Sequence, residues 1–175
     1  MPPRKYPNIL ITGTPGCGKT TTCELAAIAT GLTHLEVGKL VKERGLHDGF
    51  DDEFQSWILD EDKVVDELEP EMQQGGRIVD HHGADFFPER WFDLVVVLRA
   101  DTQVLFGRLE QRGYSSKKIE ENMECEIMQV VLDEARESYR PEIVVELPSN
   151  TVEDMENNVE RIESWVTQFV QERSE

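Results

Sequence analysis

The chain has 175 residues, of which 38% are hydrophobic, and this size suits one domain with a substantial core. It contains no run near the roughly 18 apolar residues of a membrane span, and its start lacks the pattern of a secretion signal, so we expect an intracellular protein. The net charge of −18 argues against strong non-specific binding to nucleic acids or anionic membranes, and it favours a basic protein partner.

A phosphate-binding loop follows the first predicted strand, Asn8–Thr12. Glycine residues allow backbone N–H groups to point inward around a polyphosphate. Lys19 can follow charge between the β- and γ-phosphates, the Thr20 hydroxyl can ligate Mg²⁺, and the helix that starts there turns its positive end toward the phosphates. The sequence of this loop fits the pattern G-x-x-x-x-G-K-[ST]: Gly13-Thr14-Pro15-Gly16-Cys17-Gly18-Lys19-Thr20, followed by Thr21.

The next elements alternate between helical and extended patterns. Asp60 is a good N-cap for a helix whose apolar residues fall at helical spacing and which ends before Gly75. In chain order we expect a helix from Gly18 to about Thr30, a short strand over Thr33–Val37, a helical segment over Lys39–Arg44, a Gly- and Asp-rich loop over Gly45–Ser56, and the helix that Asp60 caps.

The third predicted strand, Arg77–Asp80, ends in an acid. In phosphate-loop proteins such an acid, the Walker B residue, holds Mg²⁺ directly or through water, so Asp80 is our candidate, although a strand-end Asp can also form a turn or cap a helix. His82 lies two residues on. In an extended segment its ring would point to the same side as Asp80 and could orient a water, whereas His81 would face the other way.

The rest of the chain continues the alternation. Leu94–Leu98 is a continuous apolar run, typical of a strand buried on both faces of a parallel sheet. We expect a helix from Asp101 through Arg112, another helix marked by Met123, Ile127, Val130 and Val131, a strand over Ile143–Leu147, and a closing helix with one apolar face from Val152 to Phe169. The sum is an α/β fold around a parallel sheet, in a single domain over residues 1–175.

Arg108 and Arg112 are four residues apart and share one helix face. Facing the loop, the two guanidinium groups could clamp the nucleotide and stabilise charge on a transferring phosphoryl group. The alternative is an exposed face on which they pair with Glu110 or another acid. The segment Gly113–Lys118 has the pattern of a flap with a glycine hinge.

The chain resembles the nucleoside-monophosphate kinases, and within them the adenylate kinase isoenzyme 6 family. The aspartate-any-histidine form of the Walker B strand end is the distinguishing mark. The resemblance covers nearly the whole chain and rests on the phosphate-binding loop together with Leu59-Asp60-Glu61-Asp62, Ile78-Val79-Asp80-His81-His82, Phe86-Phe87-Pro88-Glu89-Arg90, Val97-Leu98-Arg99, Arg112-Gly113-Tyr114 and Leu147-Pro148-Ser149-Asn150.

This resemblance implies a phosphate-loop NTPase fold with a five-stranded parallel sheet, a monophosphate-binding insert at about 36–59 and a short lid at about 111–121. It implies phosphorylation of AMP-like or dAMP-like acceptors by ATP with Mg²⁺, and an intrinsic ATPase activity. It also implies a nuclear and cytoplasmic role in maturing the small ribosomal subunit, with a basic platform ribosomal protein and the pre-40S particle as partners. Lys19, Asp80, His82 and Arg112 are the catalytic candidates.

Two departures from ordinary adenylate kinases favour hydrolysis. The stretch that grips the acceptor phosphate offers only Lys39 and Lys42 where ordinary members carry an Arg, and Lys cannot bind phosphate bidentately. Beyond the lid the chain carries Glu120, Glu121, Glu124 and Glu126 in place of arginines, and acids there oppose phosphoryl transfer unless they turn outward. Three functions therefore compete: a monophosphate kinase, an ATPase switch for a macromolecular assembly, and a kinase for another small acceptor.

The remaining sequence features receive ordinary interpretations. Cys17, Cys23 and Cys125 are too few and too scattered for a disulfide framework or a zinc ribbon, so we interpret them as simple thiols. Acidic residues gather between Asp48 and Glu71 and again after Gly113, and such runs are usually solvated helix faces. We expect a monomer.

Overall fold

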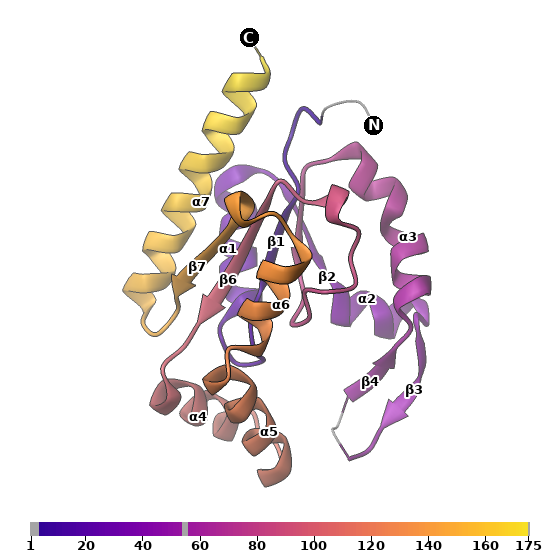
Figure 1. The fold of residues 1–175 in the computed structure, drawn as a ribbon, viewed down its shortest axis with the longest axis vertical. Coiled ribbons are helices and arrows are strands. Elements are labelled where there is room, and N and C mark those ends of the chain that lie inside the picture. Colours follow the sequence, from indigo (N-terminus) through magenta and orange to yellow (C-terminus); the bar gives the residue numbers. More distant parts are fainter. Residues whose placement is uncertain (1–3, 54–55, 175) are drawn as a thin grey trace.

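A parallel sheet of five strands forms the centre of the protein. The computed structural model describes residues 4–53 and 56–174. The strand order is β2-β5-β1-β6-β7, so the strand that precedes the phosphate-binding loop lies in the middle with a partner on each side (Figure 1). The five parallel strands predicted from the sequence are confirmed: β1 (Ile9–Thr12), β2 (Thr33–Glu36), β5 (Arg77–Asp80), β6 (Leu94–Arg99) and β7 (Val144–Pro148).

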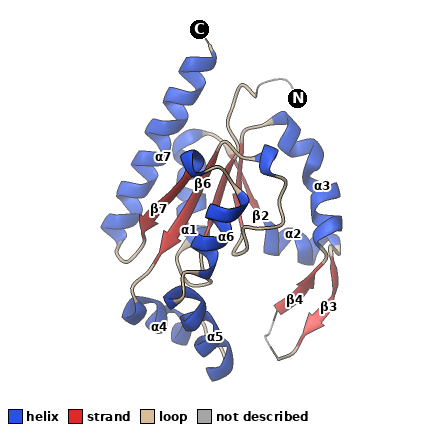
Figure 2. Cartoon of the chain, viewed as in Figure 1, coloured by secondary structure: helices blue, strands red, loops and turns tan. Residues whose placement is uncertain are grey.

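Helices cover both faces of this sheet, as Figure 2 shows. Two separate hydrophobic clusters result, because alternate residues of each buried strand point to opposite faces. On one face pack α1 (Lys19–Thr30), α4 (Thr102–Gln111) and α7 (Val152–Arg173), and on the other pack α2 (Val37–Arg44), α3 (Glu61–Gln74) and α6 (Val130–Ser138).

The register of the strands brings chemical groups to one edge. Ile11 of β1 lies beside Asp80 of β5, and Glu36 of β2 lies beside Asp80 on the other side. Because all these strands run in the same direction, their carboxyl ends meet at that edge. The phosphate-binding loop leaves β1 at Thr12, directly next to Asp80.

The helix boundaries match the sequence in most places. The Asp60 side chain caps α3 by accepting a hydrogen bond from the Lys63 backbone N–H, as predicted. Asp101 occupies the N-cap position of α4, but its side chain makes no capping hydrogen bond, and the helix ends at Gln111 with Arg112 as its C-cap. The closing helix α7 begins with a capping box formed by Thr151 and Asp154.

The prediction of a loop over Gly45–Ser56 is wrong, because β3 (His47–Asp51) lies within it and forms a hairpin with β4 (Ser56–Leu59). Phe50 faces Trp57 across the two strands, with ring centroids 5.3 Å apart, and such aromatic pairs stabilise hairpins. The register shifts between His47 and Phe50, where Gly49 adopts a φ of 121°. Only a partner strand reveals this pairing, so the Gly and Asp content misled the sequence interpretation.

The single helix expected around Met123 and Val130 is also wrong. Two helices are present, α5 (Ser116–Ile127) and α6, and between them Gln129 adopts a left-handed conformation with a φ of 59°. The Ser115 side chain caps the start of α5. The break turns α6 onto the sheet while α5 stays beside α4 (Figure 1).

Among the described residues, none of the helices combines the length and the apolar character that crossing a membrane requires.

Candidate active site

A cleft of about 740 Å³ opens at the carboxyl edge of the sheet. Parallel α/β sheets place ligands at this edge. Its lining comes from six segments: the phosphate-binding loop and start of α1 (Pro15, Lys19, Thr20), α2 (Gly38, Val41), the hairpin (Ser56, Trp57, Leu59), the end of β5 and the following loop (Asp80, His81, His82), the α4–α5 region (Arg112, Tyr114, Lys118), and α6 (Val130, Val131, Glu134).

The phosphate-binding loop has the backbone that its glycines predict. Gly16 and Gly18 adopt φ values of 98° and 83°, which L side chains rarely adopt. A Cβ atom on Gly16 would also lie 2.7 Å from the Leu105 side chain of α4, so this helix packs directly against the loop. The loop is thus a tight cradle that only glycine permits at these positions.

Donors outside the loop hold its carbonyl groups. The Arg108 guanidinium of α4 donates to the Gly16 carbonyl oxygen at 3.1 Å and to the Asn150 carbonyl oxygen at 3.2 Å. The Ser149 hydroxyl, which follows β7, donates to the Cys17 carbonyl oxygen at 2.6 Å. Arg108 therefore braces the loop backbone here, a contact that the predicted nucleotide clamp did not include. Ser149 of the Leu-Pro-Ser-Asn segment has the same bracing role, and Arg108 links this segment to the loop.

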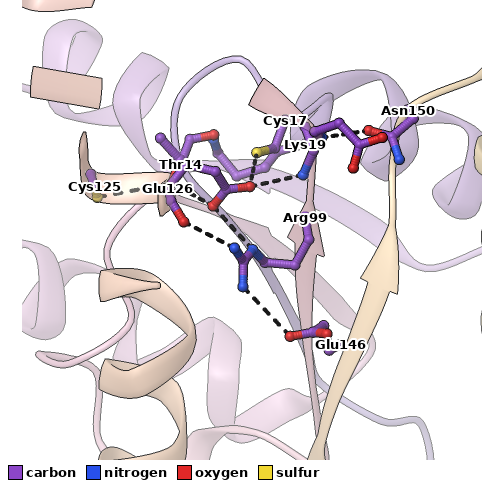
Figure 3. Close-up of polar contacts among 10 residues, drawn as sticks. Thr14, Cys17, Lys19, Arg99, Cys125, Glu126, Glu146 and Asn150 are labelled. Carbon is purple, nitrogen blue, oxygen red and sulfur yellow. Dashed lines mark hydrogen bonds and ion pairs between the residues drawn. The ribbon is translucent and has the colours of Figure 1, made fainter. Parts of the chain in front are cut away.

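A buried acid, Glu126 of α5, also contacts the loop (Figure 3). Its carboxylate accepts hydrogen bonds from the Thr14 hydroxyl at 3.1 Å, the Cys17 thiol at 3.4 Å and the Ala100 backbone N–H at 2.8 Å. The Arg99 guanidinium pairs with it at 3.1 Å. The prediction treated Glu126 as one of several acids near the transferred group, but this acid turns inward and its charge is matched by Arg99.

The thiol of Cys17 is held protonated by this arrangement. Burial and, to a smaller extent, the nearby Glu126 carboxylate raise the pKa of Cys17 to about 12. Cys17 is therefore a hydrogen-bond donor within the loop at neutral pH.

Thr20 and Asp80, the two residues predicted to bind Mg²⁺, lie in direct contact. The Thr20 hydroxyl donates to Asp80 Oδ2 at 2.9 Å, and the Asp80 side chain is only 4% exposed. A hydroxyl and a carboxylate at this spacing are hard oxygen donors of the kind that Mg²⁺ prefers, so the residues present fit this ion. The strand register explains the contact, since β5 ends beside the strand that leads into the loop.

Lys19 bends back over the loop, where its ammonium group donates to the Thr14 carbonyl oxygen at 3.3 Å. Partial burial lowers its pKa, while the neighbouring Asp80 carboxylate acts in the opposite direction. Thr21, which follows Thr20 in α1, has an exposed side chain.

His34 of β2 is a site residue that the sequence interpretation missed. Its Nε2 atom lies 3.1 Å from Asp80 Oδ2, the same oxygen that accepts from Thr20. In the sequence, His34 is only a histidine in a short predicted strand. It is 46 residues from Asp80, so no local pattern indicates that the two side chains are in contact. The pairing of β2 with β5 creates it.

The prediction that His81 and His82 point to opposite sides is wrong. Their rings lie against each other with centroids 4.3 Å apart, and both residues line the cleft. Strand β5 ends at Asp80, so the alternation of an extended chain stops there. His81 is buried against Phe86 and Phe87, while His82 keeps much of its surface exposed. Partial enclosure by the protein and the positive charges of Lys19 and Lys118 lower the pKa of His82.

Arg112 follows α4 and lines the cleft. Its guanidinium donates to the Tyr114 hydroxyl at 3.4 Å and lies 5.9 Å from the centre of the same ring. It is exposed, so it can move toward a ligand in the cleft. Arg108 and Arg112 thus separate in role: one contacts the loop backbone and the other faces the cleft.

The wall opposite the loop belongs to α2 and the hairpin. Gly38, Val41 and Trp57 line it. Lys39 and Lys42 are exposed on α2 and lie outside the set of cleft-lining residues. This wall also includes the polar residues Glu36, Ser56 and Glu61, and it contains neither lysine.

Comparisons with known proteins agree with this geometry. A family model described as an AAA domain matches residues 9–129. The chain is 56% identical to an adenylate kinase isoenzyme 6 homolog of Dictyostelium discoideum (98% of each chain covered) and 54% identical to one of Schizosaccharomyces pombe (95% of each). The fold is similar to a shikimate kinase from Bacteroides thetaiotaomicron, with a TM-score of 0.64 at 17% identity over 93% of this chain and 99% of the other.

The match in sequence extends over nearly the full length, and the match to the shikimate kinase shows that the two chains share a fold. The predicted family and fold class are both confirmed. We conclude that this chain belongs to the adenylate kinase isoenzyme 6 family of nucleotide kinases.

Proposed function

We propose that this protein transfers the γ-phosphoryl group of ATP to a nucleoside monophosphate such as AMP or dAMP, with water as a second acceptor. The observation that carries the proposal is one continuous cleft, which joins Lys19, Thr20 and Asp80 to the aromatic wall at Trp57. Its volume of about 740 Å³ lies within the range of pockets for ligands of this size.

The chain's own groups suit this reaction. The bond between Pγ and the bridging oxygen breaks as an acceptor oxygen bonds to Pγ, and negative charge develops on the transferred group. Lys19 would neutralise that charge from the loop side, and Arg112 would approach from the α4–α5 side. Thr20 and Asp80 would hold Mg²⁺, which when bound neutralises the phosphate oxygens. His82 would orient a water molecule for hydrolysis.

A second function rests on the acidic surface. An ATP-driven step in the maturation of the small ribosomal subunit, with a basic platform ribosomal protein and the pre-40S particle as partners, would use the charge of −18 to attract the partner. The placement of Lys39 and Lys42 outside the cleft also favours it, since it leaves the acceptor phosphate without a cationic contact from α2. This function implies a nuclear and cytoplasmic location.

The experiment is a side-by-side measurement of ADP formation from Mg·ATP alone and with AMP or dAMP added. Strong stimulation by the acceptor supports the kinase, and its absence supports the ATPase switch. Lys19→Ala should abolish both activities, whereas Lys42→Ala, an exposed lysine outside the cleft, should leave both intact. If Lys19→Ala retains turnover, the proposed site is wrong. If His82→Ala removes acceptor phosphorylation but spares hydrolysis, the role given to His82 is wrong.

A further inference from the structure

Three side chains of different chemistry converge behind the phosphate-binding loop. Cys23 of α1, His34 of β2 and Asp80 of β5 each offer one ligand atom, and these atoms all lie within 4.8 Å of one another. The three residues are far apart in the sequence, so the fold alone brings them together.

The strand register explains the convergence. His34 pairs with Ile78, and Asp80 lies two residues beyond Ile78, so both side chains project from the same face of the sheet. Helix α1 covers that face, where Cys23 packs in one cluster with Ile78. Cys23 and Asp80 are buried, and His34 reaches the surface with a side chain 16% exposed.

We propose that Cys23, His34 and Asp80 form a binding site for a soft divalent cation, with Zn²⁺ as the expected ion. Thiolate sulfur, imidazole nitrogen and carboxylate oxygen are the three donor types that Zn²⁺ takes in proteins, and three protein ligands leave a fourth position open to water. Binding of the ion would release the Cys23 thiol proton to solvent, and the resulting thiolate and the Asp80 carboxylate balance the charge of the ion. Mg²⁺ would not select this set, because it disfavours sulfur and nitrogen ligands.

The distances need only a small adjustment. In a tetrahedral zinc site with bonds of about 2.0–2.3 Å, the donor atoms lie roughly 3.3–3.8 Å from one another. His34 Nε2 and Asp80 Oδ2 are already 3.1 Å apart. The spacing of at most 4.8 Å to the remaining donor would have to contract by about 1 Å, which rotation of the His34 ring and a small shift of Cys23 can supply.

The site shares Asp80 with the proposed Mg²⁺ pair. Asp80 Oδ2 contacts Thr20 and His34 at once, so an ion bound to His34 and Cys23 would draw on the oxygen that the Mg²⁺ site needs. Zn²⁺ should therefore inhibit Mg²⁺-dependent turnover. This consequence rests on the proposed function, whereas cation binding itself does not.

Cobalt titration of the full chain tests the binding directly, because Co²⁺ occupies zinc sites and a thiolate ligand gives it a charge-transfer absorption band. We expect that band in the unaltered chain at one Co²⁺ per chain, and we expect added Zn²⁺ to remove it. Cys23→Ala should abolish the band, and Cys125→Ala, a half-buried thiol outside the cluster, should retain it. The assignment is overturned if the band is missing from the unaltered chain, survives Cys23→Ala, or disappears with Cys125→Ala.

His34→Gln provides a second variant at a position that is partly exposed. We expect it to weaken cobalt binding by more than about tenfold, since even changes outside a ligand set cost that much. Unchanged affinity would overturn the role of His34. In turnover assays, Cys23→Ala should remove inhibition by Zn²⁺, and persistent inhibition would overturn the competition at Asp80. A chain that shows the cobalt band but no turnover would contradict the proposed function alone.

Discussion

A single buried carboxylate, that of Glu126, accepts hydrogen bonds from two side chains of the phosphate-binding loop. Glu126 is 4% exposed, and it reaches the Thr14 and Cys17 side chains of the loop while Arg99 neutralises it. Removing the charge would leave the guanidinium with the more exposed Glu146, 3.6 Å away, as its remaining acidic partner in the described chain. Breaking buried pairs of this kind is costly.

We expect Glu126→Gln to lower the free energy of unfolding by about 2 kcal/mol, less than the full cost of breaking a buried pair because Arg99 is partly exposed. Urea unfolding measures this difference. Glu124→Gln, an exposed acid on the same helix, should change stability by less than about 0.5 kcal/mol. Equal effects of the two substitutions would contradict the role of Glu126.

The cysteines should differ in reactivity. Burial holds the pKa of Cys17 near 12 and also raises the pKa of Cys23, so neither forms appreciable thiolate at neutral pH. Burial raises the pKa of Cys125 as well, but its side chain is partly exposed, so iodoacetamide should modify it first in the native chain, and the other two should react only after unfolding. Mass spectrometry of timed samples measures the order. Early modification of Cys17 would contradict the hydrogen-bonded thiol described above.

The sequence predicted residues whose roles depend on local spacing. The glycine pattern located the phosphate-binding loop, and an acid at the end of an apolar strand located Asp80. It did not predict His34 or the inward turn of Glu126, because both depend on which strands and helices become neighbours. In a chain with 36 acidic residues, one buried carboxylate has no local signal that separates it from the solvated ones.

At the level of elements, the two walls of the cleft hold the features that the sequence predicted least well. The hairpin of β3 and β4 was expected as a loop, and the boundary between α5 and α6 was missed. Both involve a positive φ at a single residue, Gly49 or Gln129, which the pattern of apolar residues around it does not reveal. The central strands were predicted because continuous apolar runs of Val, Ile and Leu leave few alternatives.

We expect Gln129→Gly to stabilise the chain by about 0.5–1 kcal/mol, since a left-handed conformation costs a side-chain-bearing residue about that much relative to glycine. Urea unfolding measures the effect. Met128→Gly provides the control, because Met128 has an ordinary helical conformation and glycine there should destabilise. If Gln129→Gly destabilises the chain, the Gln129 side chain contributes more to stability than its left-handed backbone conformation costs, and the prediction is wrong.

The hairpin carries the aromatic side of the cleft. If an acceptor base lies against Trp57, Trp57→Ala should raise the KM for AMP roughly tenfold, because stacking of a base on an aromatic ring contributes about 1–3 kcal/mol. The KM for ATP should stay unchanged. Ile58→Ala alters the same hairpin at an exposed residue outside the cleft lining and should have little effect on either constant. Steady-state kinetics with both substrates varied distinguishes these outcomes.

For the molecule as a whole, the net charge of −18 is the dominant long-range feature. Like charges on one surface repel each other and oppose the compact state, and salt screens them: the Debye length falls from about 30 Å at 0.01 M to about 10 Å at 0.1 M. The same field would attract a basic partner at low salt.

Raising sodium chloride over this range should therefore raise the melting temperature of the chain and weaken its binding to a basic ribosomal protein. Scanning calorimetry measures the first effect, and titration of the partner at each salt concentration measures the second. An affinity that does not change with ionic strength would remove the electrostatic argument for that partner.

The position of β1 in the sheet has a consequence for hydrogen exchange. β1 is hydrogen-bonded on both sides by β5 and β6 and is buried along its whole length, so its amide protons should exchange only when the entire chain unfolds. The hairpin is a separate two-stranded sheet with largely exposed side chains, and its amides should exchange through local opening without global unfolding. Ligand-dependent slowing of exchange confined to β3 and β4 would then report an acceptor in the cleft, even when no reaction takes place.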